Sequence, residues 1–66
     1  MEIIVNGEPR QVAEHYTVAQ LLEAMELVGR RLAVEVNLEI VPRSSHVTHQ
    51  FQPDDKVEIV HAIGGG

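Results

Sequence analysis

Apolar residues bounded by turn-forming residues predict a β-hairpin at the start of the chain. Residues 1–5 carry the apolar pattern of a strand and lead into Asn6-Gly7, the dipeptide that best supplies the two positive φ values of a type I′ turn. Residues 8–13 are therefore expected to run back as a second strand. Pro9 cannot donate a hydrogen bond to a strand ladder, which places this second strand at an edge of the sheet.

A helical pattern follows, beginning after Thr17. Thr17 and Gln20 have the spacing of a capping box, in which each side chain accepts a hydrogen bond from the other residue's backbone N–H. The apolar positions repeat at i, i+3, i+4 and i+7, and they are Val18, Leu21, Leu22, Met25 and Val28. Gly29 stands where a glycine commonly ends a helix. The pattern thus predicts a helix over residues 18–28.

The second half of the chain returns to strand patterns. Residues 32–36 alternate with period two, and residues 37–39 form a turn into the short strand Ile40-Val41, which Pro42 ends. The stretch 43–52 is polar and irregular.

Phe51 is the expected hydrophobic anchor of that stretch. A turn at residues 53–56 then precedes a last strand over residues 57–62.

This order of elements predicts an α+β fold of the β-grasp (ubiquitin-like) type, with one main helix packed on a mixed sheet of four to five strands. The first and last strands are expected to pair in parallel at the centre, because the helix provides the crossover that parallel neighbours require. The residues that should face the helix are Met1, Ile3, Val5, Val57 and Ile59. Ile4 and Val60 should point to the opposite face.

Composition narrows the function. The chain has 66 residues, ten acidic and five basic, a net charge of −5, no cysteine and 3% aromatic residues. A chain of this length supports one small core. The missing thiols exclude cysteine nucleophiles, redox pairs and thiolate metal sites. An acidic chain with few aromatic residues is poorly suited to nucleic acid, and no apolar run is long enough to span a membrane. We therefore expect a cytoplasmic protein, monomeric when free, with affinity for basic partner surfaces.

The sequence ends in Ala62-Ile63 and then Gly64, Gly65 and Gly66. Folding does not explain these glycines, because each loses much conformational entropy on ordering and adds no packing. Glycine does make the chain thin enough to enter a narrow channel of another protein. We expect a β-grasp domain over residues 1–62 and a flexible tail over residues 63–66.

Residues 37–43 have the sequence Asn-Leu-Glu-Ile-Val-Pro-Arg. This segment looks like the Asn-x-x-Ile-Val-Pro-Arg segment of the sulfur carrier proteins of thiamine biosynthesis, a family of ubiquitin-like proteins that the whole chain resembles. Residues 54–60 and 62–66 match as well. The sequence departs from the family at Asp55, which occupies a position where the family commonly has glycine. Asp55 is therefore expected to adopt a left-handed conformation, and Asp55→Gly to be neutral or slightly stabilising.

The resemblance implies a carrier that is not itself an enzyme. A partner of the E1-like adenylating class would use ATP to activate the carboxylate of Gly66, and a sulfur atom supplied indirectly by a cysteine desulfurase-type donor would convert it to a thiocarboxylate. Thiazole synthase would then receive the sulfur. Ile63, Gly64 and Gly65 would give the tail access to these partners, and no cofactor would be bound by the chain.

Docking must also use the folded domain. Ile4, Glu35, Val60 and Ala62 are predicted to form a partner surface on the helix-free face of the sheet, with apolar residues beside an acidic one. His46 and His49 are three residues apart, but no helical pattern or carboxylate partner supports a metal site, and none is expected.

Two alternatives stay open. The chain could be another ubiquitin-like carrier, such as the small subunit of molybdopterin synthase, although its short length and residues 40–43 argue against this. It could also be a protein modifier joined to lysines of other proteins through Gly66. Its single lysine, Lys56, would limit chain building on itself.

Overall fold

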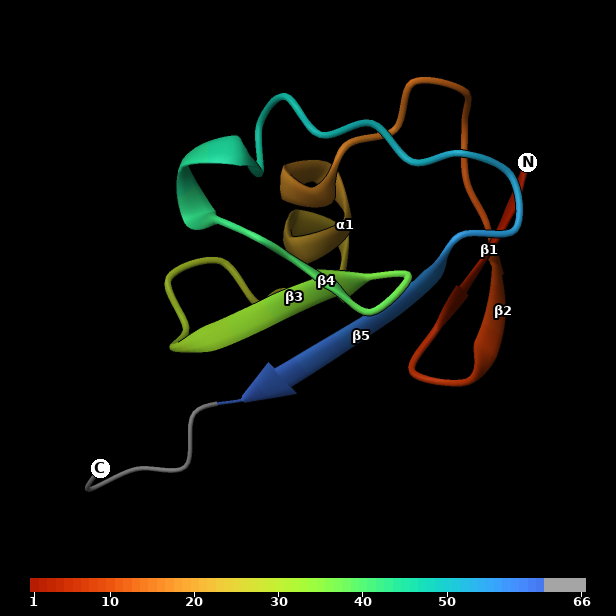
Figure 1. Ribbon diagram of the computed structural model, residues 1–66. Coiled ribbons are helices and arrows are strands. Elements are labelled where there is room, and N and C mark those ends of the chain that lie inside the picture. Colours follow the sequence, from red (N-terminus) through yellow and green to blue (C-terminus); the bar gives the residue numbers. More distant parts are fainter. Residues whose placement is uncertain (62–66) are drawn as a thin grey trace.

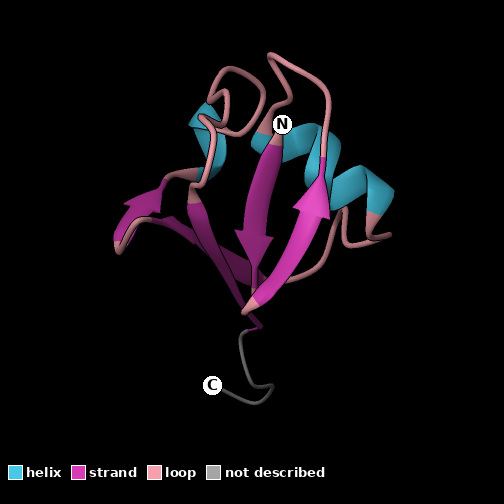
Figure 2. Ribbon diagram, turned by 90° about the vertical axis from the view of Figure 1, so that its right-hand side faces the viewer, coloured by secondary structure: helices cyan, strands magenta, loops and turns pink. Residues whose placement is uncertain are grey.

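The computed structural model describes residues 1–61, which form a five-stranded sheet, one α-helix and one 3-10 helix (Figure 1). The elements are β1 (Glu2–Val5), β2 (Glu8–Gln11), α1 (Val18–Ala24), β3 (Leu32–Val36), β4 (Glu39–Val41), η1 (Arg43–Ser45) and β5 (Lys56–His61). The strands lie in the order β2-β1-β5-β3-β4. Both helices lie on one side of the sheet (Figures 1 and 2).

The first and last strands pair as predicted. β1 and β5 are parallel neighbours, with Val5 opposite Val57, and every other pair in the sheet is antiparallel. The connection between these parallel strands includes α1, which packs its buried side against the sheet. The predicted β-grasp fold, with one main helix on a mixed sheet, is confirmed.

The opening hairpin turns where the sequence indicated. Asn6 has a φ of 49° and Gly7 a φ of 84°, the two positive values that a type I′ turn requires. Pro9 lies on β2, an edge strand, opposite Ile4. The Asn6 side chain has a second role, since its Oδ1 accepts a hydrogen bond of 2.8 Å from the backbone N–H of Ile59 and so ties the hairpin to β5.

The core lies between the sheet and α1. Alternation places Ile3 and Val5 of β1, and Val57 and Ile59 of β5, on the side facing the helix, where all are buried. The expected anchor Phe51 is 2% exposed. The remaining buried hydrophobic residues are Val18, Leu21, Leu22, Val34, Val36 and Val41, and Met1 packs partly against them. The helix-facing residues are those predicted.

The predicted helix is too long at its C-terminal end. The capping box of Thr17 and Gln20 is present, but α1 ends at Ala24. Glu26 then adopts a φ of 59°, while its N–H donates to the Glu23 carbonyl and the Leu27 N–H donates to the Leu22 carbonyl. These two bonds form a Schellman motif with glutamate, not glycine, in the left-handed position.

Because α1 ends early, the residues after it have positions other than the sequence predicted. Gly29, with a φ of 83°, lies in the turn that follows and not at the helix cap. Val28 is 68% exposed, although the helical spacing placed it on the buried face.

Glycine at position 26 is expected to stabilise the fold. A residue with a Cβ is strained at positive φ, so Glu26→Gly should raise the free energy of unfolding by about 0.5–1 kcal/mol. Thermal unfolding measures the change, and Glu23→Gly, within α1, is the matched control that should lose about 1 kcal/mol. Equal losses in both variants would contradict the assignment of Glu26 as the strained cap residue.

The turn before β5 also differs from expectation. The left-handed residue is Asp54, with a φ of 68°, whereas Asp55 is only 8% exposed. The Asp55 carboxylate accepts hydrogen bonds from Asn37 Nδ2 at 2.9 Å and from the Gln52 backbone N–H at 2.8 Å. The expected left-handed conformation of Asp55 was therefore wrong: Asp54 adopts it, and the Asp55 side chain joins the loop before β5 to the β3–β4 turn.

Candidate functional site

The face of the sheet that α1 leaves uncovered carries charged and apolar side chains, with two carboxylates and one lysine. Along β5, Lys56, Glu58 and Val60 alternate with buried residues and are all exposed, Val60 to 51%. The structure also places Ile4 of β1 and Glu35 of β3 on this face, both half-buried. We call these five residues, together with Ala33 and Ile40, the sheet face.

Two carboxylates of the sheet face lie directly opposite each other. Glu35 of β3 pairs with Glu58 of β5 in the antiparallel register, and like charges at such positions repel. Apolar neighbours surround them, with Ala33 opposite Val60 in the same strand pair and Ile40 opposite Glu35 on β4. A cationic side chain from another molecule would relieve this repulsion, so the arrangement favours contact with a basic surface.

Sequence reasoning missed part of the sheet face. Four residues join the predicted ones through the pairing of β5 with β1 and of β3 with both of its neighbours, namely Lys56, Glu58, Ala33 and Ile40. The alternation within each strand could have indicated which residues point outward. Which outward residues are neighbours depends on the register between strands distant in sequence.

The glycine tail follows the end of β5 at His61. His61 pairs with Leu32, the first residue of β3, at the end of the sheet opposite the β3–β4 turn. Ala62, Ile63, Gly64, Gly65 and Gly66 lie outside the described residues. The predicted docking residue Ala62, the tail access residues and the predicted reactive residue are therefore not placed.

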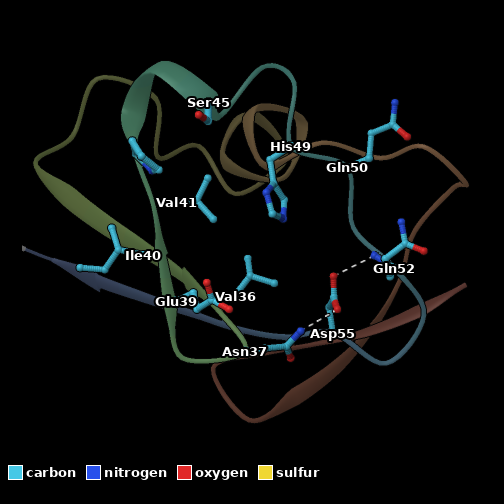
Figure 3. Close-up of a pocket in the computed structure, with 11 residues that line it drawn as sticks. Val36, Asn37, Glu39, Ile40, Val41, Ser45, His49, Gln50, Gln52 and Asp55 are labelled. Carbon is cyan, nitrogen blue, oxygen red and sulfur yellow. Dashed lines mark hydrogen bonds between the residues drawn. The ribbon is translucent and has the colours of Figure 1, made fainter.

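A polar pocket of about 420 Å³ lies at the other end of β5 (Figure 3). It contains the hydrogen bonds that Asp55 accepts from Asn37 and Gln52. The Asn37 Oδ1 in turn accepts a hydrogen bond from the Lys56 backbone N–H at 3.0 Å. In the described part of the chain, no buried side-chain nitrogen or oxygen lacks a partner. The hydrogen bonds of Asn37 and Asp55 in this pocket connect the β3–β4 turn to the loop before β5 and so stabilise the fold.

The histidines do not assemble into a metal site. His46 Nε2 lies 3.2 Å from the Val41 carbonyl oxygen, and the His49 ring packs edge-on against Phe51. His15 Nδ1 lies 3.1 Å from Gln50 Oε1. Within residues 1–61, no three histidine, aspartate or glutamate side chains form a group that could hold a metal ion. The same residues contain no helix long and apolar enough to cross a membrane.

The segment that carried the family resemblance, residues 37–43, has a structural role along most of its length. Asn37 and Leu38 both have positive φ values, 51° and 71°, and form the turn from β3 to β4. Val41 is buried, and Pro42 precedes the 3-10 helix that begins at Arg43. Asn37 thus contributes to the fold through its turn conformation and its side-chain hydrogen bonds to Asp55 and Lys56.

One helix on a mixed sheet, an uncovered acidic sheet face and a glycine-rich sequence after the central strand define a ubiquitin-like carrier protein. The family model described as the ThiS family matches residues 3–66. The chain belongs to this family, the sulfur carrier proteins of thiamine biosynthesis.

Relatives of known name support this membership. The chain is 33% identical over 66 residues to the sulfur carrier protein ThiS of Escherichia coli, and the match covers all of both chains. The crystal structure of the thiamine biosynthesis protein ThiS from Geobacter metallireducens has a TM-score of 0.85, with 33% identity and complete coverage of both chains. These comparisons confirm the predicted class, a ubiquitin-like carrier that is not an enzyme.

Some relatives are much longer. The thiazole synthase of Paramagnetospirillum magneticum is 46% identical over 66 residues, a match that covers 100% of this chain and 20% of that protein. A second thiazole synthase, from Magnetococcus marinus, is 38% identical with the same coverage. The chain thus spans about a fifth of the length of these two proteins, which include a segment similar to it.

Proposed function

We propose that the chain carries sulfur for thiazole formation on the carboxylate of Gly66. The observation that carries this proposal is the extent of the family match, which runs from residue 3 through the three glycines to residue 66. In this proposal the domain comprises residues 1–62, and residues 63–66 are the part that enters partner enzymes. The reaction takes place in the cytoplasm.

The chemistry needs no catalytic side chain from the carrier. A carboxylate is a poor electrophile, so its oxygen first attacks the α-phosphorus of ATP on an adenylating enzyme, and pyrophosphate leaves. The terminal sulfur of a partner's cysteine persulfide, derived indirectly from a cysteine desulfurase-type donor, then displaces AMP from the carbonyl carbon and forms an acyl disulfide. A second thiol of the partner cleaves the S–S bond, so that a disulfide forms on the partner and the thiocarboxylate stays on Gly66. ATP is a substrate of the partner enzyme, and the carrier binds no cofactor of its own.

Thiazole synthase is the proposed recipient of the sulfur. Two relatives with this name include a segment similar to the entire chain, which favours a partnership between carrier and synthase. Gly64 and Gly65 lack a Cβ, so the chain that precedes the reactive carbonyl can pass through a narrow opening. Ile63 directly precedes this thin segment.

Intact mass measurement tests the proposal. The full chain is incubated with the adenylating enzyme of the same organism, ATP and a sulfur source. The expected product has one oxygen replaced by sulfur, and fragmentation should place the exchange at Gly66. Stable adducts between Gly66 and lysines of other proteins would instead identify a protein modifier. Stable assembly with a molybdopterin synthase large subunit would identify the other carrier.

The sheet face is the proposed docking surface for these enzymes. Its opposed carboxylates Glu35 and Glu58 repel each other in the free protein, and a basic residue of a partner would bind between them. Ile4 and Val60 supply apolar contact area beside the charges. Ala62 belongs to the same proposed surface on sequence grounds alone.

Charge reversal on the sheet face is expected to weaken partner binding while the domain stays folded. Glu35→Lys should raise the Kd for the adenylating enzyme about tenfold, which corresponds to roughly 1.4 kcal/mol, and should keep or raise the thermal midpoint because the repulsion with Glu58 is lost. Val60→Asp should have a similar effect on binding. Glu14→Lys, at an exposed loop position, is the control with the same charge change. Unchanged adenylation kinetics in both sheet-face variants would contradict this docking surface.

A further inference from the structure

A second uncovered surface lies on the helix side of the molecule. It is a groove of about 330 Å³ between the segment after α1, the start of β3 and the segment around η1. Its lining includes the apolar residues Leu27, Val28, Leu32 and Val47 and the exposed arginines Arg30 and Arg43. We call this surface the basic groove.

The basic groove exists because α1 ends early. The Schellman motif at Glu26 and Leu27 turns the chain away from the helix axis, and Val28 is left 68% exposed. Val47, which follows η1, lines the same groove and is 70% exposed. Single exposed apolar residues are common on protein surfaces, but here two of them line one groove together with two arginines.

The charge of the basic groove is opposite to that of the whole chain. The chain has a net charge of −5 and five basic residues, of which Arg30 and Arg43 line the groove. Arg31 follows directly in the sequence. Among the described residues that line the groove, none is acidic. A local positive potential on an acidic protein favours a ligand that carries carboxylates.

The basic groove lies near the end of β5, the strand that precedes the glycine tail in the sequence. Leu32 lines the groove and pairs with His61, the last described residue of β5. The groove therefore lies at the end of the sheet from which the chain continues toward Gly66, on the side opposite the sheet face. A protein that receives the residues after His61 comes close to both surfaces.

We propose that the basic groove binds an acidic segment of the enzyme that receives the tail. An apolar side chain of that segment packs between Val28 and Val47, and its carboxylates pair with Arg30 and Arg43. This inference rests on the proposed function, because the function requires such an enzyme. The acidic sheet face and the basic groove need partner surfaces of opposite charge, so together they fix the orientation in which the carrier presents its tail.

Binding measurements with matched variants test the inference. The full chain is titrated calorimetrically, without ATP, against the adenylating enzyme and against thiazole synthase of the same organism. Arg30→Gln should raise the Kd for at least one of these enzymes about fivefold and weaken its salt dependence, as should Arg43→Gln. Arg31→Gln is the control, because Arg31 is the exposed neighbouring arginine that does not line the groove. Its effect should stay within about twofold.

The apolar contact has its own pair of variants. Val47→Asp should raise the same Kd about tenfold, or roughly 1.4 kcal/mol, while Leu38→Asp should leave it unchanged. Leu38 is 84% exposed in the turn between β3 and β4, at the other end of β5. Thermal unfolding should be unchanged by Val47→Asp, since the exposed Val47 side chain contributes little to the core.

Several outcomes would overturn the inference. The inference would be overturned if the Arg30, Arg43 and Val47 variants left the Kd for both enzymes unchanged. It would also be overturned if the Arg31 variant bound as weakly as the Arg30 variant. Sedimentation showing a wild-type dimer that these variants dissociate would assign the groove to a second copy of the chain. Binding of the wild-type chain to anionic phospholipid vesicles, lost in the variants, would assign it to a membrane. The proposed function fails separately, if the wild-type chain gains no sulfur in the mass experiment.

Discussion

A chain that lacks Gly66 is expected to lose the ability to restore growth of a thiamine auxotroph deprived of its own sulfur carrier, whereas the full chain restores it. Removal of one residue withdraws the terminal carboxylate by about 3 Å. A misplacement of even about 1 Å at a reacting centre can reduce a rate on the order of 100-fold. Growth without thiamine measures the loss, and intact mass should show no exchange of oxygen for sulfur.

The controls for this truncation separate chemistry from folding. The truncated chain should show the thermal midpoint of the full chain, because every residue of the described core precedes position 62. Leu38→Asp, in the turn at the opposite end of the β3–β5 pair from His61, should restore growth as well as the unmodified sequence does. Growth supported by the chain without Gly66 would contradict the carrier mechanism, whatever its stability.

In the proposed function the reacting group is a backbone carboxylate, which explains why side-chain motifs contributed little to the prediction. The proposed reaction uses no nucleophile, acid, base or metal ligand of this chain, so the missing cysteine and the scattered histidines are consistent with it. The informative signals were the glycines that follow a strand and the family-like segment at residues 37–43. In the structure that segment forms a turn, a buried strand residue and the start of η1.

The parts of the fold that sequence predicted are those determined by local interactions. The turn at Asn6-Gly7 needs two positive φ values, and the capping box needs only Thr17 and Gln20. The parallel pairing of β1 and β5 followed from the position of the helix between them. Each of these features depends on neighbouring residues or on the order of elements.

The features that sequence could not predict depend on contacts between distant residues. Glu26 carries no signal of a helix end, because glutamate is a good helix former and rarely adopts positive φ. Glu58 became part of the candidate docking surface only when the register placed it opposite Glu35. The basic groove likewise combines residues from the segment after α1 with residues around η1.

The turn before β5 shows the same limitation and leads to the second large effect. Sequence similarity to a glycine-containing turn suggested that Asp55 has a left-handed backbone conformation, whereas Asp54 is the residue that adopts it. The true partner of Asp55 is Asn37, 18 residues away, which spacing alone cannot reveal. The backbone carbonyl of Asp55 also accepts a 2.9 Å hydrogen bond from the Ile4 N–H, so the residue joins β1, the β3–β4 turn and the loop before β5.

Asp55→Gly is therefore expected to destabilise the domain by about 2–3 kcal/mol, because it leaves the Asn37 side-chain amide and the Gln52 N–H without their acceptor. For a domain of this size such a loss lowers the thermal midpoint by roughly 10–20 °C. Asp55→Asn, which keeps one side-chain oxygen, should lose less.

Asp54→Gly is the matched control for the neighbouring position, and the opposite sign is expected. Asp54 is exposed and has a φ of 68°, so glycine should relieve strain and raise the free energy of unfolding by up to about 1 kcal/mol. Thermal and urea unfolding of the two variants measure both changes. If Asp55→Gly were stabilised and Asp54→Gly destabilised, Asp55 would be the strained left-handed residue and Asp54 the hydrogen-bond acceptor. The hydrogen bonds from Asn37 and Gln52 to the Asp55 carboxylate predict the reverse, since they make that side chain the acceptor on which the turn depends.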